Sequence, residues 1–262
     1  MLLENKNALV YGAGGKIGAA VARAFAREGA NVFLAGRTLT TLEAVAAEIS
    51  IAGGTAETAG VDALDEQAVE EHASSVAGRA GSIDVSFNAI SLGDVQGTPL
   101  LEMPLEDYSR PIMVGTTTHL LTARAAARHM LERGAGVILT LSASGVRIAD
   151  PVMGPPLMGG FGVACSAIEA LTMNLAGELG PRGIRVVCLR PEGIPESWRE
   201  YPEESKQFAD LKEFHDLLEG RTLLRRLPTL AEVANVAAFM ASDQASAMTA
   251  TVVNLTCGSI AE

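Results

Sequence analysis

Four small residues, Gly12-Ala13-Gly14-Gly15, could bring backbone amides close to a phosphate group. They follow an apolar run at residues 8–11 that has the length of a buried strand, and a periodic helix begins directly after them. Backbone N–H groups and the helix dipole favour an anion at such a helix start. The pattern favours a dinucleotide pyrophosphate there, and a tight turn that binds nothing is the alternative.

The charge at the end of the next strand indicates which dinucleotide would bind. NAD sites tend to place a carboxylate there for the ribose 2′-hydroxyl, whereas this chain has Gly36-Arg37. Arg37 can make a bidentate contact with a 2′-phosphate, and Lys16 in the glycine loop adds a second positive charge. We therefore expect NADP(H) in preference to NAD(H), with a solvated surface Arg37 as the alternative.

Composition is typical of one well-packed domain spanning residues 1–262. Hydrophobic residues make up 48% of the chain, yet no run reaches membrane-spanning length without a glycine or polar break. The first ten residues show no secretion signal, and the three cysteines lie far apart, so we expect a cytoplasmic protein with reduced thiols. A net charge of −11 argues against nucleic acid and anionic membranes as partners. No metal site is predicted.

Strand and helix patterns alternate along the whole chain. Strands are predicted at residues 8–11, 31–35, 55–61, 83–87, 137–141, 184–189 and 251–255, and the longest helices at 116–133 and 161–179. Turn-forming residues, Asp94 among them, crowd positions 91–99, and Arg190 to Gly193 break the sixth strand. The alternation predicts an α/β fold: a Rossmann-like, doubly wound parallel sheet of about seven strands with helices on both faces. Residues 194–226 are interpreted as a helical substrate lid.

The whole chain resembles the short-chain dehydrogenases/reductases. The resemblance rests on the sequence YGAGGKIG at residues 11–18, where the family usually has TGxxxGIG, and on IDVSFNA at 83–89. It continues in Ile184-Arg185-Val186, in Pro191 and in LPTLAEVANVAAFMASD at 227–243. Lys16 stands at a usual glycine, and LTCG at 255–258 replaces a usual VDGG.

The resemblance implies roles for the residues that match the family's cofactor motifs. Gly12, Ile17 and Gly18 should frame the pyrophosphate and the nicotinamide, Asp62 should meet the adenine, and Asn88 with Ala89 should line the adenosine ribose. The full set of predicted cofactor-binding residues is Gly12, Gly14, Gly15, Lys16, Ile17, Gly18, Arg37, Asp62, Ala63, Asn88, Ala89 and Pro191.

The family's proton-transfer residues are missing. Members use a tyrosine phenol, a lysine four residues later that lowers its pKa, a serine and an asparagine. Here Phe161 falls at the tyrosine position, Cys165 at the lysine, Gly115 near the asparagine, and Ala143 or its neighbours Ser142 and Ser144 near the serine. None of the three tyrosines and four lysines forms Tyr-x-x-x-Lys. The catalytic residue is therefore unknown, and Ser142, Phe161 and Cys165 are predicted to face the substrate.

Several side chains could substitute, each with a structural alternative. His119 could act as an acid or be a packed histidine. Tyr201 and Lys206 could be delivered by the lid or be solvated, and Ser142 and Ser144 could bind a substrate oxygen or only satisfy backbone. Cys165 as a nucleophile would need a base that the sequence does not offer nearby. Phe161 with three methionines suggests an apolar pocket or simply core; these methionines are Met153, Met158 and Met173.

Three functions are compatible with these residues. The first is an NADP(H)-dependent oxidoreductase with non-standard proton delivery, and the second is a catalytically silent NADP(H)-binding homologue that acts as a sensor, partner subunit or scaffold. A lyase or isomerase that reuses the cleft is the third. The resemblance also implies a homodimer or homotetramer formed through helices 116–133 and 161–179. Alanines at 123 and 125–127 would permit close helix approach, although internal packing explains them equally well.

Overall fold

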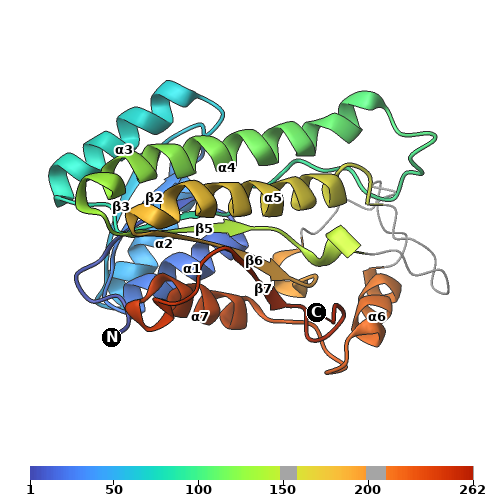
Figure 1. The fold of residues 1–262 in the computed structure, drawn as a ribbon. Coiled ribbons are helices and arrows are strands. Elements are labelled where there is room, and N and C mark those ends of the chain that lie inside the picture. Colours follow the sequence, from blue (N-terminus) through green and yellow to red (C-terminus); the bar gives the residue numbers. More distant parts are fainter. Residues whose placement is uncertain (148–157, 199–210, 262) are drawn as a thin grey trace.

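A computed structural model describes residues 1–147, 158–198 and 211–261 (Figure 1). Seven strands form one sheet in the order β3-β2-β1-β4-β5-β6-β7, and every neighbouring pair is parallel. The strands are β1 (Asn7–Tyr11), β2 (Asn31–Gly36), β3 (Thr55–Gly60), β4 (Val85–Asn88), β5 (Gly136–Leu141), β6 (Ile184–Pro191) and β7 (Thr251–Leu255). The predicted Rossmann-like fold is confirmed.

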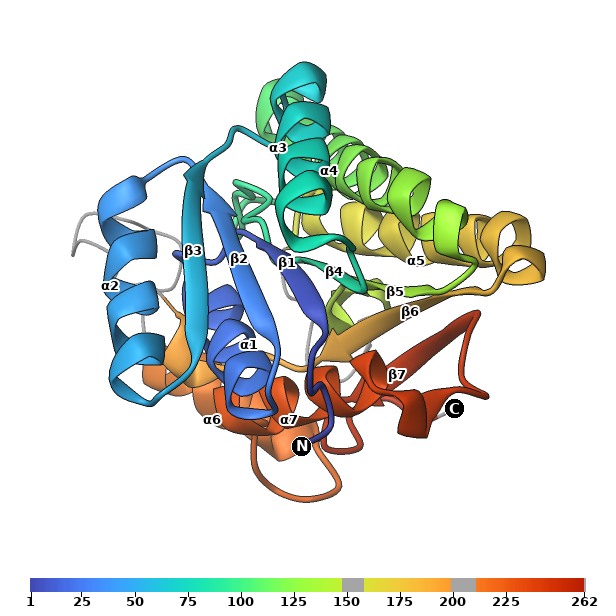
Figure 2. The same ribbon diagram turned by 90° about the vertical axis from the view of Figure 1, so that its left-hand side faces the viewer.

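Helices cover both faces of the sheet (Figure 2). The helices α1 (Lys16–Arg27), α2 (Leu39–Ile51) and α7 (Leu230–Ala241) pack on one face, and α3 (Glu66–Ala80), α4 (Leu105–Arg133) and α5 (Phe161–Leu179) on the other. Each face of the sheet has its own apolar core, and alternate residues of β1 point to opposite faces. Ala8 and Val10 pack in the core on the α1, α2 and α7 side, whereas Leu9 and Tyr11 pack in the core on the α3, α4 and α5 side. A seventh helix, α6 (Leu211–Arg221), lies beyond the carboxyl ends of the strands.

The sheet order reverses between β1 and β4. From β1 the successive strands β2 and β3 are added towards one edge of the sheet, and from β4 the strands β5, β6 and β7 are added towards the other edge. At such a switch point the loops after the two strands separate and leave a crevice, which is where open α/β sheets bind ligands. The glycine loop follows β1, and the segment from Ala89 to Pro104 follows β4. The fold therefore brings these two segments to one edge of the sheet.

Helix α4 begins at Leu105, eleven residues before the predicted start at Thr116. Glu106 and Asp107 lie in its first turn, where negatively charged side chains interact favourably with the positive end of the helix dipole. Pro111 lies inside the helix and is buried, close to Gly160 at the start of α5. This tertiary packing outweighs the cost of proline in a helix, which the sequence pattern alone did not predict.

Strand β6 also runs further than predicted, to Pro191 instead of Leu189, because Arg190 and Pro191 remain in register with Asn254 and Leu255 of β7. Among the described helices, none has the length and apolar character that a membrane crossing requires.

Candidate active site and cofactor cradle

The glycine loop after β1 is shaped by Gly12 and Gly18, where backbone atoms leave no room for a side chain, and by Gly14, which lies against the Thr41 side chain. A Cβ atom at Gly12, where φ is +75°, would lie 2.6 Å from the carbonyl oxygen of Ala89. At Gly18 it would lie 2.3 Å from the carbonyl oxygen of Gly12, and at Gly14 it would lie 2.3 Å from Oγ1 of Thr41. At Gly15 the nearest atom would be 3.4 Å away. The loop is therefore held tightly at Gly12 and Gly18, while a Cβ atom at Gly15 would make only an ordinary van der Waals contact.

Helix α1 starts from this loop with a free amino-terminal end. Gly15 is its N-cap and contributes no side-chain cap, and its first turn contains no acidic residue. Gly14, Gly15 and Lys16 are exposed there. Uncapped N–H groups and the positive end of the helix dipole favour an anionic ligand.

Two positive charges border this helix end. Lys16 and Arg37 are both exposed, and neither makes a hydrogen bond or ion pair with any residue that the structure describes. Asp62, at the end of β3, is exposed and its Oδ1 accepts a hydrogen bond from the Leu64 amide at 3.0 Å, whereas Ala63 is buried. A tight loop, an open helix end and two unpaired cations fit the diphosphate and 2′-phosphate of a nicotinamide dinucleotide.

Asn88 and Ala89 connect the loop after β4 to this cradle. The Asn88 side chain is buried: its Nδ2 donates to Oγ1 of Thr122 at 3.0 Å, and its Oδ1 accepts from the amide of Ile90 at 3.0 Å. The Ala89 amide donates to the Tyr11 carbonyl at 2.9 Å. Asn88 therefore fixes the turn, and Ala89 borders the cavity beside it.

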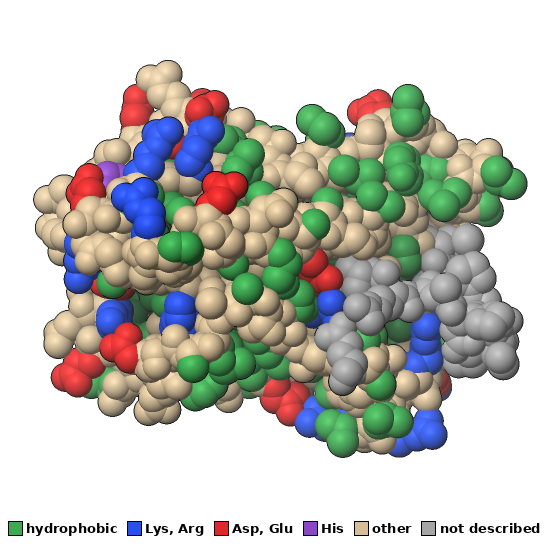
Figure 3. Space-filling view, in the orientation of Figure 1, with side chains coloured by type: hydrophobic (Ala, Val, Ile, Leu, Met, Phe, Trp, Pro, Cys, Tyr) green, Lys and Arg blue, Asp and Glu red, His purple; other side chains and the backbone are tan. Residues whose placement is uncertain are grey.

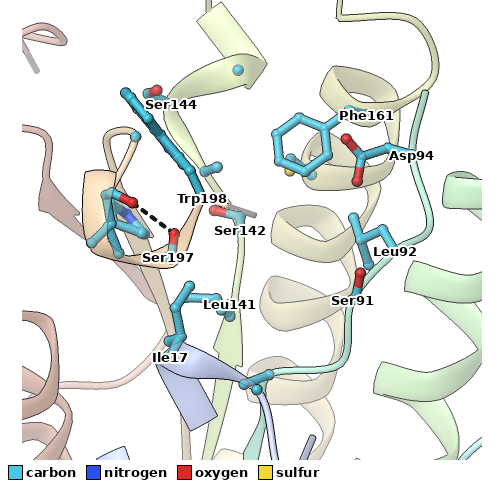
Figure 4. Close-up of a pocket in the computed structure, with 18 of the residues that line it drawn as sticks. Ile17, Ser91, Leu92, Asp94, Leu141, Ser142, Ser144, Phe161, Ser197 and Trp198 are labelled. Carbon is cyan, nitrogen blue, oxygen red and sulfur yellow. Dashed lines mark hydrogen bonds between the residues drawn. The ribbon is translucent and has the colours of Figure 1, made fainter. Parts of the chain in front are cut away.

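A cavity of about 600 Å³ runs from the glycine loop past the carboxyl ends of β4, β5 and β6 to Trp198 and α6 (Figure 4). Its walls are mainly apolar, with contributions from Ile17, Ile90, Leu92, Met158, Phe161, Ile194, Trp198, Phe214 and Leu218. A cavity of this size with few polar groups is typical of small-molecule sites.

The cavity brings together most of the residues predicted from the sequence. Those that line it are Gly14, Gly15, Lys16, Ile17, Asn88, Ala89, Ser142, Phe161, Cys165 and Pro191. Gly12 and Gly18 shape the loop behind this surface. Arg37, Asp62 and Ala63 lie at the neighbouring strand ends and outside the cavity lining.

The residues that the resemblance places at or near the family's proton-transfer positions lie at the far end of the cavity. Phe161, Ala143 and Cys165 line the cavity there. Gly115 packs nearby, and a Cβ atom on it would lie 3.3 Å from both Ile168 and Leu92. Burial raises the pKa of the Cys165 thiol, so this group is protonated at neutral pH. The nucleophile hypothesis for Cys165 finds no support.

Ser142 has a structural partner. Its hydroxyl donates to Oε1 of Glu169 at 2.7 Å, and Glu169 forms a bidentate ion pair with Arg190, in which both N–O distances are 2.7 Å. The two ion-paired side chains are only 14% and 3% exposed. Ser142 borders the cavity, but its proton is used to join β5 to this buried pair on α5 and β6.

His119 is not available as an acid. It is buried, its Nδ1 lies 2.8 Å from the carbonyl oxygen of Gly115, and its Nε2 lies 3.4 Å from the amide of Leu141. Burial lowers the His119 pKa to about 4, so the imidazole is neutral at pH 7. The proposed acid role is wrong, and the packed histidine is the correct interpretation.

Two carboxylates in the cavity wall were not recognised from the sequence. Asp94, interpreted as a turn residue, is half-buried and points into the cavity beside Phe161 (Figure 4). Glu192, interpreted as a strand breaker, is buried and accepts hydrogen bonds from the hydroxyls of Ser144 and Ser259 and from the Gly193 amide at 3.0 Å. Their positions after β4 and β6, at the carboxyl edge of the sheet, were the available signal.

The remaining candidates divide into two groups. Met158 lines the cavity, whereas Met173 lies in a separate shallow hollow with Ser166 and Ala250, so its predicted place in the pocket is wrong. Met153, Tyr201 and Lys206 lie outside the described residues. Trp198 and two residues of α6, Phe214 and Leu218, line the cavity as the lid hypothesis requires.

Fold and site together define a dinucleotide-binding α/β protein, and comparison with known proteins identifies the family. A family model described as enoyl-(acyl carrier protein) reductase matches residues 12–259. The chain belongs to the short-chain dehydrogenase/reductase family, and it is of the oxidoreductase type.

Its relatives are similar along almost their whole length. The uncharacterised oxidoreductase YxbG of Bacillus subtilis is 33% identical over 247 residues, which cover 94% of this chain and 88% of YxbG. Gluconate 5-dehydrogenase of Gluconobacter oxydans is 29% identical and covers 93% of this chain and 90% of its own. The structure of a short-chain type dehydrogenase/reductase from Mycobacterium marinum is 31% identical with a TM-score of 0.85, and the match covers 99% of this chain and 97% of that chain. An NAD⁺-bound xylitol dehydrogenase is 29% identical with a TM-score of 0.83, and the match covers 97% of this chain and 98% of that chain.

Proposed function

We propose that this protein is an NADP(H)-dependent oxidoreductase of the short-chain dehydrogenase/reductase type with a non-standard active site. The observation that carries the proposal is the steric requirement for glycine at Gly12 and Gly18, beside two cations, Lys16 and Arg37, that have no partner among the described residues. A phosphorylated dinucleotide needs a close backbone approach to its diphosphate and positive charge beside its 2′-phosphate, and these residues can provide both.

The glycine loop and the start of α1 would hold the pyrophosphate, while Ala89 and Pro191 would border the nucleoside parts. Arg37 and Lys16 would pair with the 2′-phosphate, which is the reason for preferring NADP(H). The related xylitol dehydrogenase is bound to NAD⁺, so the preference rests on the charges of this chain alone. When bound, the nicotinamide would supply or accept a hydride at the Phe161 end of the cavity.

Proton transfer would differ from that of the family. Phe161 has no proton to give, and Cys165 has no positive charge. Losing general acid–base assistance costs roughly 10²- to 10⁴-fold in rate. Ordinary ketone reduction would therefore be slow, and the preferred substrate is one that needs no proton from the protein.

A turnover screen tests this function. Purified protein and NADPH are incubated with ketones, enones and quinones, and oxidation of NADPH is followed by absorbance. Turnover that disappears in Arg37→Glu and persists in Arg182→Glu, the same charge change at an exposed site beyond the opposite end of the sheet, would support the proposal. Turnover that is unchanged in Arg37→Glu would contradict the assigned cofactor site.

The second candidate is a catalytically silent NADP(H)-binding homologue that serves as a sensor, partner subunit or scaffold. It is favoured by Phe161 and Cys165 at the family's tyrosine and lysine positions and by Gly115 near the asparagine position. NADPH binding without oxidation of the nucleotide by any substrate would favour this function.

We also propose that the protein forms a homodimer or homotetramer through α4 and α5. Ala123 and Ala125–Ala127 are buried within the core, so internal packing accounts for them. Apolar side chains are nevertheless exposed over α4 and the segment before it (Figure 3), with Met113 62% and Leu120 41% exposed. Light scattering of the wild type and of Leu120→Glu tests this, because a charge in the contact should favour the monomer.

Residues 1–262 would act as one dinucleotide-binding domain, with residues 194–226 as a substrate lid. Trp198 and α6 support the lid because they form one end of the cavity wall. The three cysteines, Cys165, Cys188 and Cys257, are free thiols, which fits the proposed cytoplasmic location.

A further inference from the structure

The substrate end of the cavity carries negative charge. Its two carboxylates are Asp94 and Glu192. Among the described lining residues the only basic side chain is Lys16, which lies at the opposite, cofactor end. His119 adds no positive charge because its imidazole is neutral at pH 7.

Neither carboxylate has a basic partner among the described residues, but Glu192 is satisfied by two hydroxyls and an amide, whereas Asp94 accepts a single side-chain hydrogen bond. Its Oδ2 accepts a hydrogen bond from Nε2 of Gln96 at 2.7 Å, and no basic side chain of the described residues pairs with it. Arg110 is close to Gly93, but its guanidinium binds Asp107 at 3.0 Å and Glu106 at 3.6 Å. A half-buried carboxylate without a cation leaves a favourable place for a positively charged ligand.

Aromatic side chains surround the same space. Phe161 lies next to the Asp94 carboxylate, and Trp198 lies across the cavity from it (Figure 4). Trp198 is further packed against Phe214, with 5.6 Å between the ring centroids. Aromatic faces attract organic cations, and most strongly where water is displaced. Phe161 thus converts the family's tyrosine position from a proton donor into part of an apolar wall.

We propose that the substrate end binds an organic cation: an iminium ion as the oxidised substrate and the corresponding amine, as its ammonium form, as the reduced one. The inference rests on the proposed function and names its substrate class. Asp94 would pair with the nitrogen, and Phe161 and Trp198 would contact its apolar body.

The chemistry of an iminium ion explains the missing tyrosine and lysine. Its nitrogen already carries the positive charge, so when its carbon accepts a hydride the π electrons of the C=N bond move to nitrogen as a lone pair. The product is a neutral amine, the dihydronicotinamide is oxidised to the nicotinamide cation, and charge balances without a proton from the protein. The amine then takes its proton from water. A ketone, in contrast, needs a proton on oxygen in the same reaction.

A pair of matched ligands tests the site by binding alone. Tetrahydroisoquinoline is protonated at neutral pH, whereas isochroman has the same shape with an uncharged oxygen in place of the nitrogen. Both are titrated into the full chain by calorimetry, with fluorescence of Trp198, the single tryptophan, as a second readout. We expect the amine to bind at least about tenfold more tightly than its oxygen analogue.

Variants locate the effect. Asp94→Asn should reduce the amine's advantage to less than about threefold while leaving isochroman binding unchanged, because only the charged partner is lost. Glu106→Gln, which removes an exposed carboxylate outside the cavity, should keep the full advantage. Equal affinity for the two ligands in the wild type would overturn the proposal, and so would an advantage that persists in Asp94→Asn.

A parallel NADPH titration separates this inference from the proposed function. If NADPH binds and the amine has no advantage, the cation site is wrong and the oxidoreductase remains. If NADPH does not bind, the proposed function and the redox role of the cation fail, and the amine titration still decides the cation site. Reduction of dihydroisoquinoline by NADPH, weakened in Asp94→Asn, would support both.

Discussion

The glycine end of the cavity and its α5 end place different demands on their residues. At the glycine end the backbone would bind the ligand, and close backbone contacts of Gly12 and Gly18 leave no room for a larger residue at these two positions. At the α5 end the family relies on side-chain oxygen and nitrogen atoms, and Phe161 and Cys165 fill their space without providing them. The first end retains its requirements, and the second has lost its proton donor.

This difference shows that binding geometry and proton chemistry are separable in one cavity. Cys165 packs with Leu92, Ala164 and Ile168 in a local apolar core, which lies apart from the glycine loop on the same seven-stranded sheet. The constraint on the loop comes from the fold itself. The constraint on the α5 end came only from the reaction.

Restoring the proton-transfer residues should have the largest effect on this comparison. The variant Ala143→Ser/Phe161→Tyr/Cys165→Lys should increase NADPH-dependent ketone reduction by roughly 10²- to 10⁴-fold. The matched variant Ala143→Ser/Phe161→Tyr/Cys165→Met has similar bulk without the ammonium group and should gain much less. If the two variants reduce ketones at the same rate, the assignment of position 165 is wrong.

Glu169 tests whether the polar group beneath the α5 end serves the structure. Glu169→Ala removes the carboxylate that pairs with Arg190 and accepts the Ser142 hydroxyl, and it should lower the free energy of unfolding by about 1.5–3 kcal/mol. The control, Glu48→Ala, removes an exposed ion pair with Arg23 and should cost less than about 1 kcal/mol. Denaturant titrations measure both, and similar losses in the two variants would contradict the buried role.

His119 tests the claim that the α5 end contains no acid at neutral pH. Its pKa is lowered to about 4 in the folded protein, against 6.5 as the ordinary value, so the unfolded chain binds more protons between these two values. The stability due to the neutral imidazole is complete above pH 6.5 and is lost as pH falls toward 4. Between pH 7.5 and pH 5 the wild type should lose about 2 kcal/mol more than His119→Gln. Equal losses would show that His119 does not titrate in this way.

Substitutions in the glycine loop should have a smaller effect, and this effect should be confined to NADPH binding at the glycine end of the cavity. Gly18→Ala places a methyl group where only 2.3 Å is available and should weaken NADPH binding roughly 10- to 100-fold, since overpacking costs about 1–3 kcal/mol. Gly15→Ala, with 3.4 Å available, should change it little. Circular dichroism checks that both variants are folded. Equal weakening in the two would mean that flexibility and not space is what the loop requires.

The fold could be predicted from local patterns because each element carries its own signals. Apolar runs of strand length and glycine stops located all seven strands, and the glycine cradle followed from the strand, loop and helix around it. The start of α4 could not be found in this way, because Pro111 is tolerated only through its packing beside Gly160, about fifty residues away in the chain.

The roles of the polar side chains in the site could not be predicted, because they depend on contacts between residues far apart in the sequence. Asp94 looks like a turn residue until the loop after β4 is placed beside Phe161, and the Ser142 hydroxyl looks available until Glu169 is placed next to it. What the sequence did establish was an absence, since the count of tyrosines and lysines excludes the family's dyad without any structure. The sequence also placed Phe161 and Cys165 at those positions, whereas the carboxylates of Asp94 and Glu192 in the same cavity became visible only in three dimensions.

The most direct test of the account is a titration of the wild type, Arg37→Glu and Arg182→Glu with NADPH and, separately, with NADH, followed by nucleotide fluorescence and quenching of Trp198. We predict that the wild type and Arg182→Glu bind NADPH at least about tenfold more tightly than NADH, and that Arg37→Glu loses this preference because the 2′-phosphate loses its partner. A preference for NADPH that survives in Arg37→Glu would contradict the role of Arg37, and failure of both nucleotides to bind would contradict the central claim that the glycine end of the cavity is a working cofactor site.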